Sequence, residues 1–175
     1  MAIKEVLRLG DQRLLRIADP INDITLEQTF LKQLYQDMVD SMKHYGGVGI
    51  AAPQIGVNAR VILFGFDKNP RYPEEASIPE TFLINPTYTV QTEETEAGLE
   101  GCLSVPGLRG SVRRFTKIRY SGYSINNEKI ERTASGFHAR VIQHECDHLD
   151  GILYPFKIDD YAQFGFEDLL LAKNI

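Results

Sequence analysis

Hydrophobic residues recur at helical spacing between residues 25 and 44. Leu26, Phe30, Leu34, Met38 and Met42 follow one another at steps of four, and Leu31, Tyr35 and Val39 widen the apolar face. Residues four apart lie on one face of a helix, so the pattern predicts a long amphipathic helix lying across a sheet. Thr25 and Gln28 have the spacing of a capping box, which predicts that the helix begins there.

Shorter runs rich in β-branched and aromatic residues predict strands in the middle of the chain. We expect them at residues 60–66, 81–85, 87–90, 112–123 and 129–134. Residues 67–80, rich in Pro, Glu and Lys, are typical of an exposed loop.

A second helix is expected over residues 136–149. Ser135 is a suitable N-cap, and Gly151 can adopt the backbone conformation that ends a helix. A long helix, several strands and another helix predict an α+β fold, not alternating βαβ units. We therefore expect mixed or mostly antiparallel sheets wrapped around the second helix, in a single domain spanning residues 1–175.

The composition narrows the class of protein. Hydrophobic residues make up 43% of the 175 positions, and Gly and Pro number 14 and 8, which excludes a disordered chain or a Gly- and Pro-rich fibre. The longest apolar stretch, residues 61–66, is too short to span a membrane. The first residues have no apolar leader core, so we expect a cytoplasmic protein with no membrane partner.

The net charge of −5 disfavours binding to nucleic acid. A basic run nevertheless contains Arg109, Arg113, Arg114, Lys117 and Arg119. The pattern fits the polar side of a strand, and we expect no specific nucleic-acid partner. RNA binding is the alternative, which a salt-dependent gel shift would reveal.

His144 and His148 frame an H-E-x-x-H motif in the second predicted helix. A step of four residues turns the helix by about 40° and rises about 6 Å, so both imidazoles can bind one ion. Glu145 lies at the edge of that face, where it can act as a base on a water molecule. Cys146 faces away and is expected in the core. The alternative is a solvated helix with two ordinary histidines.

A catalytic metal needs a third protein ligand. No His follows His148, and the acids downstream do not match the spacing of H-E-x-x-H endopeptidases. Upstream, residues 100–104 supply the Cys102 thiol in a segment that contains Gly. Cys102 is either this ligand or an ordinary buried cysteine.

Residues 46–56 are rich in Gly and contain G-x-G-x-x-A. A dinucleotide site is excluded, because a helix precedes the segment and Pro53 interrupts the helix that should follow. The segment is either a tight turn or a backbone along which an extended ligand can lie. In the second case the Gln54 amide could donate a hydrogen bond to an oxyanion.

In this order the three segments resemble the motifs of the peptide deformylase family. The family's G-x-G-x-A-A-x-Q, E-G-C-x-S and Q-H-E-x-D-H stand at residues 47–54, 100–104 and 143–148. The resemblance covers nearly the whole chain, from Asp11 to Tyr154. It implies a hydrolase that removes the formyl group from the N-terminal formylmethionine of new polypeptides and releases formate.

The resemblance also implies a cofactor and a ligand set. Cys102, His144 and His148 would hold one divalent metal ion, Fe(II) in most relatives, with Zn(II), Ni(II) or Co(II) able to replace it. Glu100 and Ser104 would orient the loop that carries Cys102. Some relatives dock on the ribosome through a long basic helix, which is not evident in this sequence.

The catalytic roles implied by the resemblance fall to Glu145 as general base, and to the Gln54 side chain and the Leu103 N–H as oxyanion donors. The substrate-binding residues would be Val48, Gly49, Ile50, Arg109, Phe137 and Val141. Arg140 stands where many relatives have an aliphatic residue. The alternatives are a general H-E-x-x-H peptidase and a non-enzymatic metal domain or formyl-peptide binder.

Overall fold

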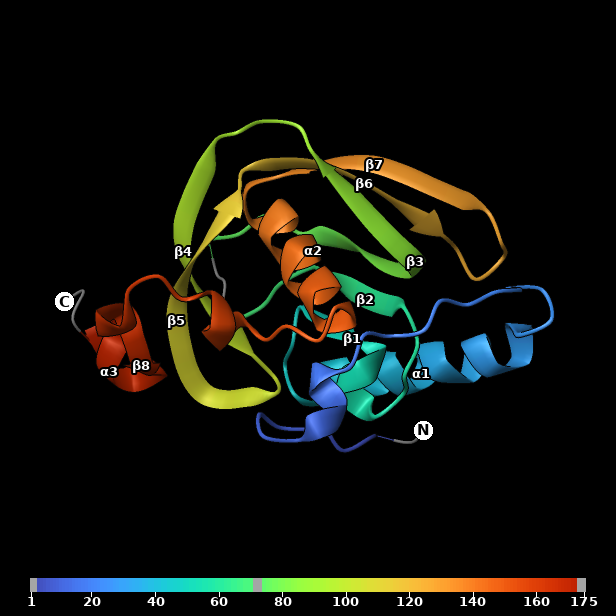
Figure 1. The fold of residues 1–175 in the computed structure, drawn as a ribbon, viewed down its shortest axis with the longest axis horizontal. Helices are drawn as coiled ribbons and strands as arrows, with labels where there is room; N and C mark the ends of the chain where they lie inside the picture. Colours follow the sequence, from blue (N-terminus) through green and yellow to red (C-terminus); the bar gives the residue numbers. More distant parts are fainter. Residues whose placement is uncertain (1–2, 71–73, 173–175) are drawn as a thin grey trace.

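Two antiparallel sheets enclose a helix in the computed structural model, which describes residues 3–70 and 74–172 (Figure 1). One sheet has the strand order β1 (Gly49–Ala51), β2 (Val61–Phe66), β3 (Ile78–Val90), β6 (Lys117–Tyr123) and β7 (Lys129–Ser135). The other has the order β4 (Thr95–Cys102), β5 (Val105–Phe115) and β8 (Phe164–Phe166). The α-helices are α1 (Gln28–His44), α2 (Gly136–Leu149) and α3 (Glu167–Ala172). The predicted α+β fold is confirmed.

The enclosed helix is α2, which carries the H-E-x-x-H motif. It packs against strands of both sheets, and its Ile142 and Leu149 are fully buried. Ser135 holds the N-cap position without a side-chain hydrogen bond, and Gly151 adopts φ +72° just beyond the helix. The predicted bounds of this helix are confirmed, and its burial fixes the motif between the two sheets.

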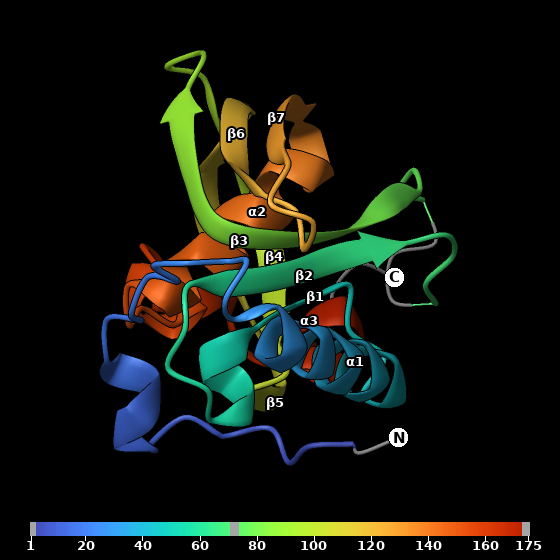
Figure 2. The same cartoon turned by 90° about the vertical axis from the view of Figure 1, so that its right-hand side faces the viewer.

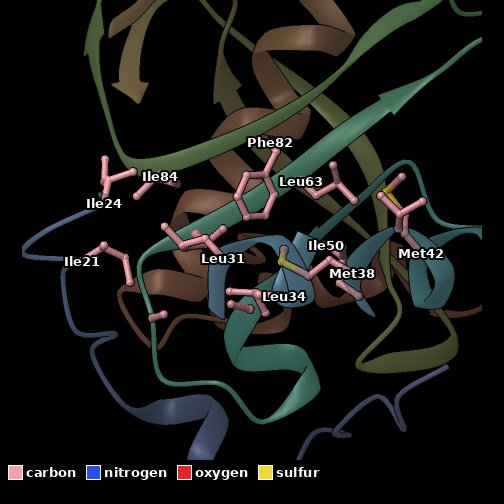
Figure 3. Close-up of a cluster of buried hydrophobic side chains, with 14 of the residues drawn as sticks. Ile21, Ile24, Leu31, Leu34, Met38, Met42, Ile50, Leu63, Phe82 and Ile84 are labelled. Atoms are coloured by element: carbon pink, nitrogen blue, oxygen red, sulfur yellow. The ribbon is translucent and has the colours of Figure 1, made fainter. Parts of the chain in front are cut away.

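α1 lies across the face of the larger sheet (Figure 2). Its buried face packs on β1, β2 and β3, as Figure 3 shows for Leu31, Leu34 and Met38. The predicted capping box is wrong. Thr25 precedes the helix in a turn where the carboxylate of Asp23 accepts a hydrogen bond of 3.0 Å from the Thr25 N–H.

Two strand predictions need correction. The segments expected at residues 81–85 and 87–90 form the single strand β3, whose pairing with β6 is irregular where Asn85 adopts φ +50°. The Asn85 side chain binds the backbone N–H and C=O of Ile21, at 2.9 and 2.8 Å. The run at residues 112–123 divides at Thr116 into β5 and β6, which belong to different sheets.

Candidate metal centre and active site

Cys102, His144 and His148 meet where β4 ends beside α2. One sulfur or nitrogen atom from each residue lies within 4.8 Å of the others, and Cys102 Sγ is 3.3 Å from His148 Nε2. Both histidines are buried, and their ring centroids are 5.0 Å apart. A sulfur and two imidazoles form a donor set that suits a divalent transition metal and leaves a fourth position for a reactant.

Glu100 orients one of these ligands. Its Oε2 lies 2.8 Å from His144 Nδ1, so the opposite ring nitrogen is left for a metal. Arg114 donates two hydrogen bonds to the same carboxylate, at 2.8 and 2.9 Å. Burial alone would raise the pKa of Glu100, but the hydrogen bonds with Arg114 and His144 lower it well below its usual range. The ionised carboxylate therefore holds the imidazole in one orientation.

Asp147, on α2, extends this buried charge network from Arg114 to Lys157. Its carboxylate accepts from Arg114 Nη1 at 2.5 Å and pairs with Lys157 Nζ at 2.9 Å. Arg114 and Asp147 are each at most 5% exposed, so their charges are compensated by one another and not by water. The network joins β5 to α2 on the side of the helix next to the ligands.

Glu145 has the environment of a general base. Its side chain is buried, and among the described residues its Oε2 has no hydrogen-bond partner. Burial raises the pKa of Glu145 to about 7, close to the value at which a carboxylate exchanges protons most effectively near neutral pH. The backbone of β1 lies against it: a Cβ on Gly49 would be 2.8 Å from Glu145 Cδ.

Gln54 is held with its amide nitrogen toward Cys102. It lies in the short 3₁₀ helix Ala52–Ile55 and is 1% exposed. Its Oε1 accepts a hydrogen bond from Ala51 N at 2.8 Å, and its Nε2 donates to Ser104 Oγ at 3.0 Å and to Cys102 Sγ at 3.4 Å. This fixed orientation presents a hydrogen-bond donor at the edge of the metal site.

A cleft opens above these groups. Its walls include most of the predicted site residues, namely Val48, Gly49, Gln54, Cys102, Leu103, Phe137, Val141, His144 and Glu145. Gly46, Gly47, Leu99, Glu100, Gly101 and Arg140 complete the lining. His148 lies beneath the cleft, beside Cys102.

Ile50, which the resemblance implied as a substrate-binding residue, is not among the residues that line the cleft. Its side chain is 0% exposed and belongs to the hydrophobic cluster under α1 (Figure 3). Neighbouring residues of a strand face opposite sides, so Ile50 turns away from the site where Gly49 approaches Glu145.

Arg109 also lies outside the walls of this cleft. It lines an adjoining groove and forms an ion pair with Glu167, which sequence reasoning did not single out. Nothing in its spacing relative to the motifs marked Glu167, because the contact depends on the pairing of β8 with β5.

The basic run is divided by the fold. Arg109 and Arg114 are buried and paired with carboxylates, and Arg119 on β6 pairs with Glu131. These arginines therefore do not share one exposed strand face.

Comparison with known sequences gives a consistent result. The family described as polypeptide deformylase matches residues 3–163. A "Peptide deformylase 2" of Pseudomonas putida is 51% identical over 168 residues, covering 96% of this chain and 94% of the relative. A "Peptide deformylase 2" of Ralstonia nicotianae is 52% identical over 171 residues, covering 98% and 96%.

Solved structures agree with the sequence comparison. A Met-Ala-Ser-bound class I type b peptide deformylase from Acinetobacter baumannii superposes with a TM-score of 0.86 at 38% identity, covering 90% of this chain and 99% of that chain. A peptide deformylase from Thermotoga maritima gives 0.79 at 31% identity, covering 91% and 100%.

Proposed function

Because this chain belongs to the polypeptide deformylase family, we propose that Cys102, His144 and His148 are its metal ligands and Glu145 its general base. Peptide deformylases are metal-dependent hydrolases that remove the N-formyl group of nascent polypeptides, and this chain is an enzyme of that class. The observation that carries the assignment of residues is the convergence of one thiol and two imidazoles beside a buried carboxylate.

The donor set fits a bound divalent ion. One cysteine sulfur and two imidazole nitrogens supply three ligands, and Glu100 already orients one of the rings. A metal held there supplies Lewis acidity to the formyl carbonyl and to water. Fe(II) is the proposed resident ion, as the family resemblance implies, with Zn(II), Ni(II) or Co(II) as substitutes.

The chain's own residues carry out proton transfer and stabilise the oxyanion. Glu145 takes a proton from the attacking water and later returns it to the leaving amine, a role that suits a carboxyl with a pKa of about 7. The Gln54 amide and the Leu103 backbone N–H, both on the cleft wall, donate hydrogen bonds to the oxyanion that develops on the formyl oxygen.

The substrate is a formylmethionyl peptide in the proposed complex. Val48 and Gly49 border the cleft with little bulk, so an extended backbone can lie beside them. Phe137 and Val141 supply the apolar wall for the methionine side chain. Arg109 lies in the adjoining groove, paired with Glu167, and there it would bind the part of the peptide beyond the methionine.

The proposed substrate also indicates where in the cell the enzyme works. We place the enzyme in the cytoplasm, as one catalytic domain over residues 1–175 that meets nascent chains near the ribosome. Among residues 3–70 and 74–172, no helix is long and apolar enough to cross a membrane. α3 contains no Lys or Arg, so it offers no basic surface for ribosome docking.

Formate release from formyl-Met-Ala-Ser tests the assignment of the base. Protein purified without oxygen is compared with Glu145→Gln, and metal content is measured for both. We expect Glu145→Gln to keep the metal and to lose about 100- to 10,000-fold in kcat, the usual contribution of a general base. A fully loaded Glu145→Gln protein with unchanged turnover would contradict the proposal.

Substitution of Cys102 or His148 by Ala tests the proposed ligands, with the bound metal measured in each variant. Each of Cys102→Ala and His148→Ala should bind less metal, whereas Cys146→Ala should bind as much as the unsubstituted protein, because Cys146 is buried away from the site. Failure of the unsubstituted, metal-loaded enzyme to release formate would contradict the mechanism as a whole.

A further inference from the structure

The C-terminal part of the chain brings a carboxylate to the side of the active site. β8 pairs with β5 through Leu108, Arg109 and Gly110, and α3 follows directly. Gly110 favours this close approach, because a Cβ there would lie 3.1 Å from Cδ2 of its β8 partner Phe164. The close packing on β5 therefore fixes the position of the first residue of α3, Glu167.

Glu167 and Arg109 form a two-point ion pair. Glu167 Oε1 accepts hydrogen bonds from Arg109 Nε at 2.9 Å and from Nη2 at 2.7 Å. The Arg109 side chain is 7% exposed and that of Glu167 is 34% exposed. A buried positive charge is thus compensated by a carboxylate that reaches into solvent, and the pair as a whole is neutral.

The pair lies in a groove that adjoins the catalytic cleft. The groove and the cleft share Gly101, Cys102 and Leu103 as a common wall. The Arg109 guanidinium rests against Gly101, where a Cβ would be 3.5 Å from its Nε. A peptide that leaves the cleft along this wall therefore passes the ion pair within the next residues of its chain.

We propose that Glu167 is a specificity-determining residue of this enzyme, because it cancels the charge of Arg109 at the exit of the substrate cleft. The inference rests on the proposed substrate path. With Glu167 in place, residues beyond the formylmethionine are accepted without regard to negative charge. Without it, the positive charge of Arg109 selects substrates with a carboxylate at the second or third position.

The test measures KM and kcat for matched formyl peptides with Glu167→Gln. The pairs are formyl-Met-Asp-Ala-amide against formyl-Met-Asn-Ala-amide, and formyl-Met-Ala-Asp-amide against formyl-Met-Ala-Asn-amide. For Glu167→Gln we expect KM of an Asp peptide to fall about five-fold relative to its Asn partner, as one partly exposed charge pair allows. The kcat values should stay within about two-fold, and added salt should weaken the preference.

Two further variants separate this effect from a general loss of structure. Asp168→Asn removes the same charge from the neighbouring, exposed position and should leave the wild-type KM ratio unchanged. The double variant Arg109→Gln with Glu167→Gln should lose the preference for Asp that the single variant gains.

Equal Asp-to-Asn ratios in Glu167→Gln and the wild type, at both positions, would overturn the inference. A preference for Asp that persists in the double variant would overturn it as well. Wild-type turnover of the Asn peptides distinguishes the two levels of the argument: if it is absent, the proposed function fails and the inference falls with it.

Discussion

Gln54 illustrates how a single side chain is prepared for one task. Its oxygen is occupied by the Ala51 N–H, so only its nitrogen can face the sulfur of Cys102. An amide that was free to flip would present an acceptor half of the time. The hydrogen bond to Ala51 therefore converts an ambiguous group into a dedicated donor.

We expect Gln54→Glu to remove this donor with almost no change of shape. One carboxylate oxygen can still accept from Ala51, while the other would face the developing oxyanion and repel it. The loss in kcat should be about 100- to 1,000-fold, as for other oxyanion donors. Steady-state formate release measures it, and Gln36→Glu, on the surface of α1, serves as control. A normal kcat for Gln54→Glu would exclude the amide from the oxyanion site.

At the scale of elements, β1 acts through its backbone and not through side chains. Gly49 leaves room for the Glu145 carboxyl group, so strand and helix approach one another more closely than a Cβ would permit. The short strand thereby forms one wall of the pocket that holds the Glu145 carboxyl group.

Gly49→Ala should therefore displace the base. A methyl group at this position would sit 2.8 Å from Glu145 Cδ, and a displacement of the base of about 1 Å can cost about 100-fold in kcat. Turnover and thermal unfolding are measured together, and kcat is expected to fall far more than stability. Gly165→Ala is the control, because its Cβ would meet nothing closer than 3.8 Å. Equal effects of the two substitutions would contradict this account.

Arg140 joins α2 to the smaller sheet. Its guanidinium donates to the carbonyl oxygens of Val112 at 2.7 Å and Glu96 at 2.8 Å, and to the Glu100 carboxylate at 3.0 Å. It lies directly on Gly98, where a Cβ would be 2.8 Å from Nη2. Arg140 thus serves to hold β4 and β5 against the helix.

Arg140→Met should keep the bulk of the side chain and lose these hydrogen bonds. We expect a cost of about 2 kcal/mol in the free energy of unfolding, because polar groups at the cleft would be left without their donor. For a chain of this size that corresponds to a fall in Tm of roughly 4–8 °C. Thermal unfolding measures the change, with Arg113→Met at an exposed position of β5 as control. An unchanged Tm would show that Arg140 does not hold the sheet.

The two long helices, and the placing of His144 and His148 on one helix face, could be predicted from the sequence because their signals are local. The four-residue periodicity of α1 and the H-E-x-x-H spacing of α2 each act within one element. The start of α1 differs from the prediction: Thr25 has the spacing of a cap, yet it lies in a turn that Asp23 stabilises before the helix begins. Competing short-range hydrogen bonds determine where a helix begins, and residue spacing alone does not predict them.

Strands and contacts between sheets were harder to predict. β4 has no regular alternation of apolar residues, since Gly98 and Gly101 are placed to admit arginine side chains from other elements. β8 is only three residues long and becomes a strand through its pairing with β5. The roles of Arg140 and Glu167 depend on the same tertiary contacts, so no pattern within their own segments could reveal them.

At the scale of the whole molecule, the proposed metal site connects the two sheets through α2. Cys102 ends a strand of the smaller sheet, and the two histidines belong to the helix that packs on both sheets. A ligand bound by both bodies stabilises only the folded arrangement in which they meet.

Removal of the metal should accordingly lower both activity and stability. Treatment with a chelator is expected to abolish formate release and to reduce Tm by roughly 5–10 °C relative to protein in excess metal, with both restored on adding a divalent ion. A thiol reagent should then modify Cys102 in the stripped protein and not in the loaded one. Cys146 should resist in both, because burial raises the pKa of its thiol to about 12. Identical reactivity of the two forms would argue against Cys102 as a ligand.

The wide sequence separation of the site residues has a consequence for how the enzyme comes into being. Gln54, Cys102 and His148 can meet only after long loops have closed, and such non-local contacts form slowly during folding. Residues near the end of the chain still have to pair with β5 before its groove is complete. We therefore expect a metal to bind late in folding, once Cys102 and His148 have come together.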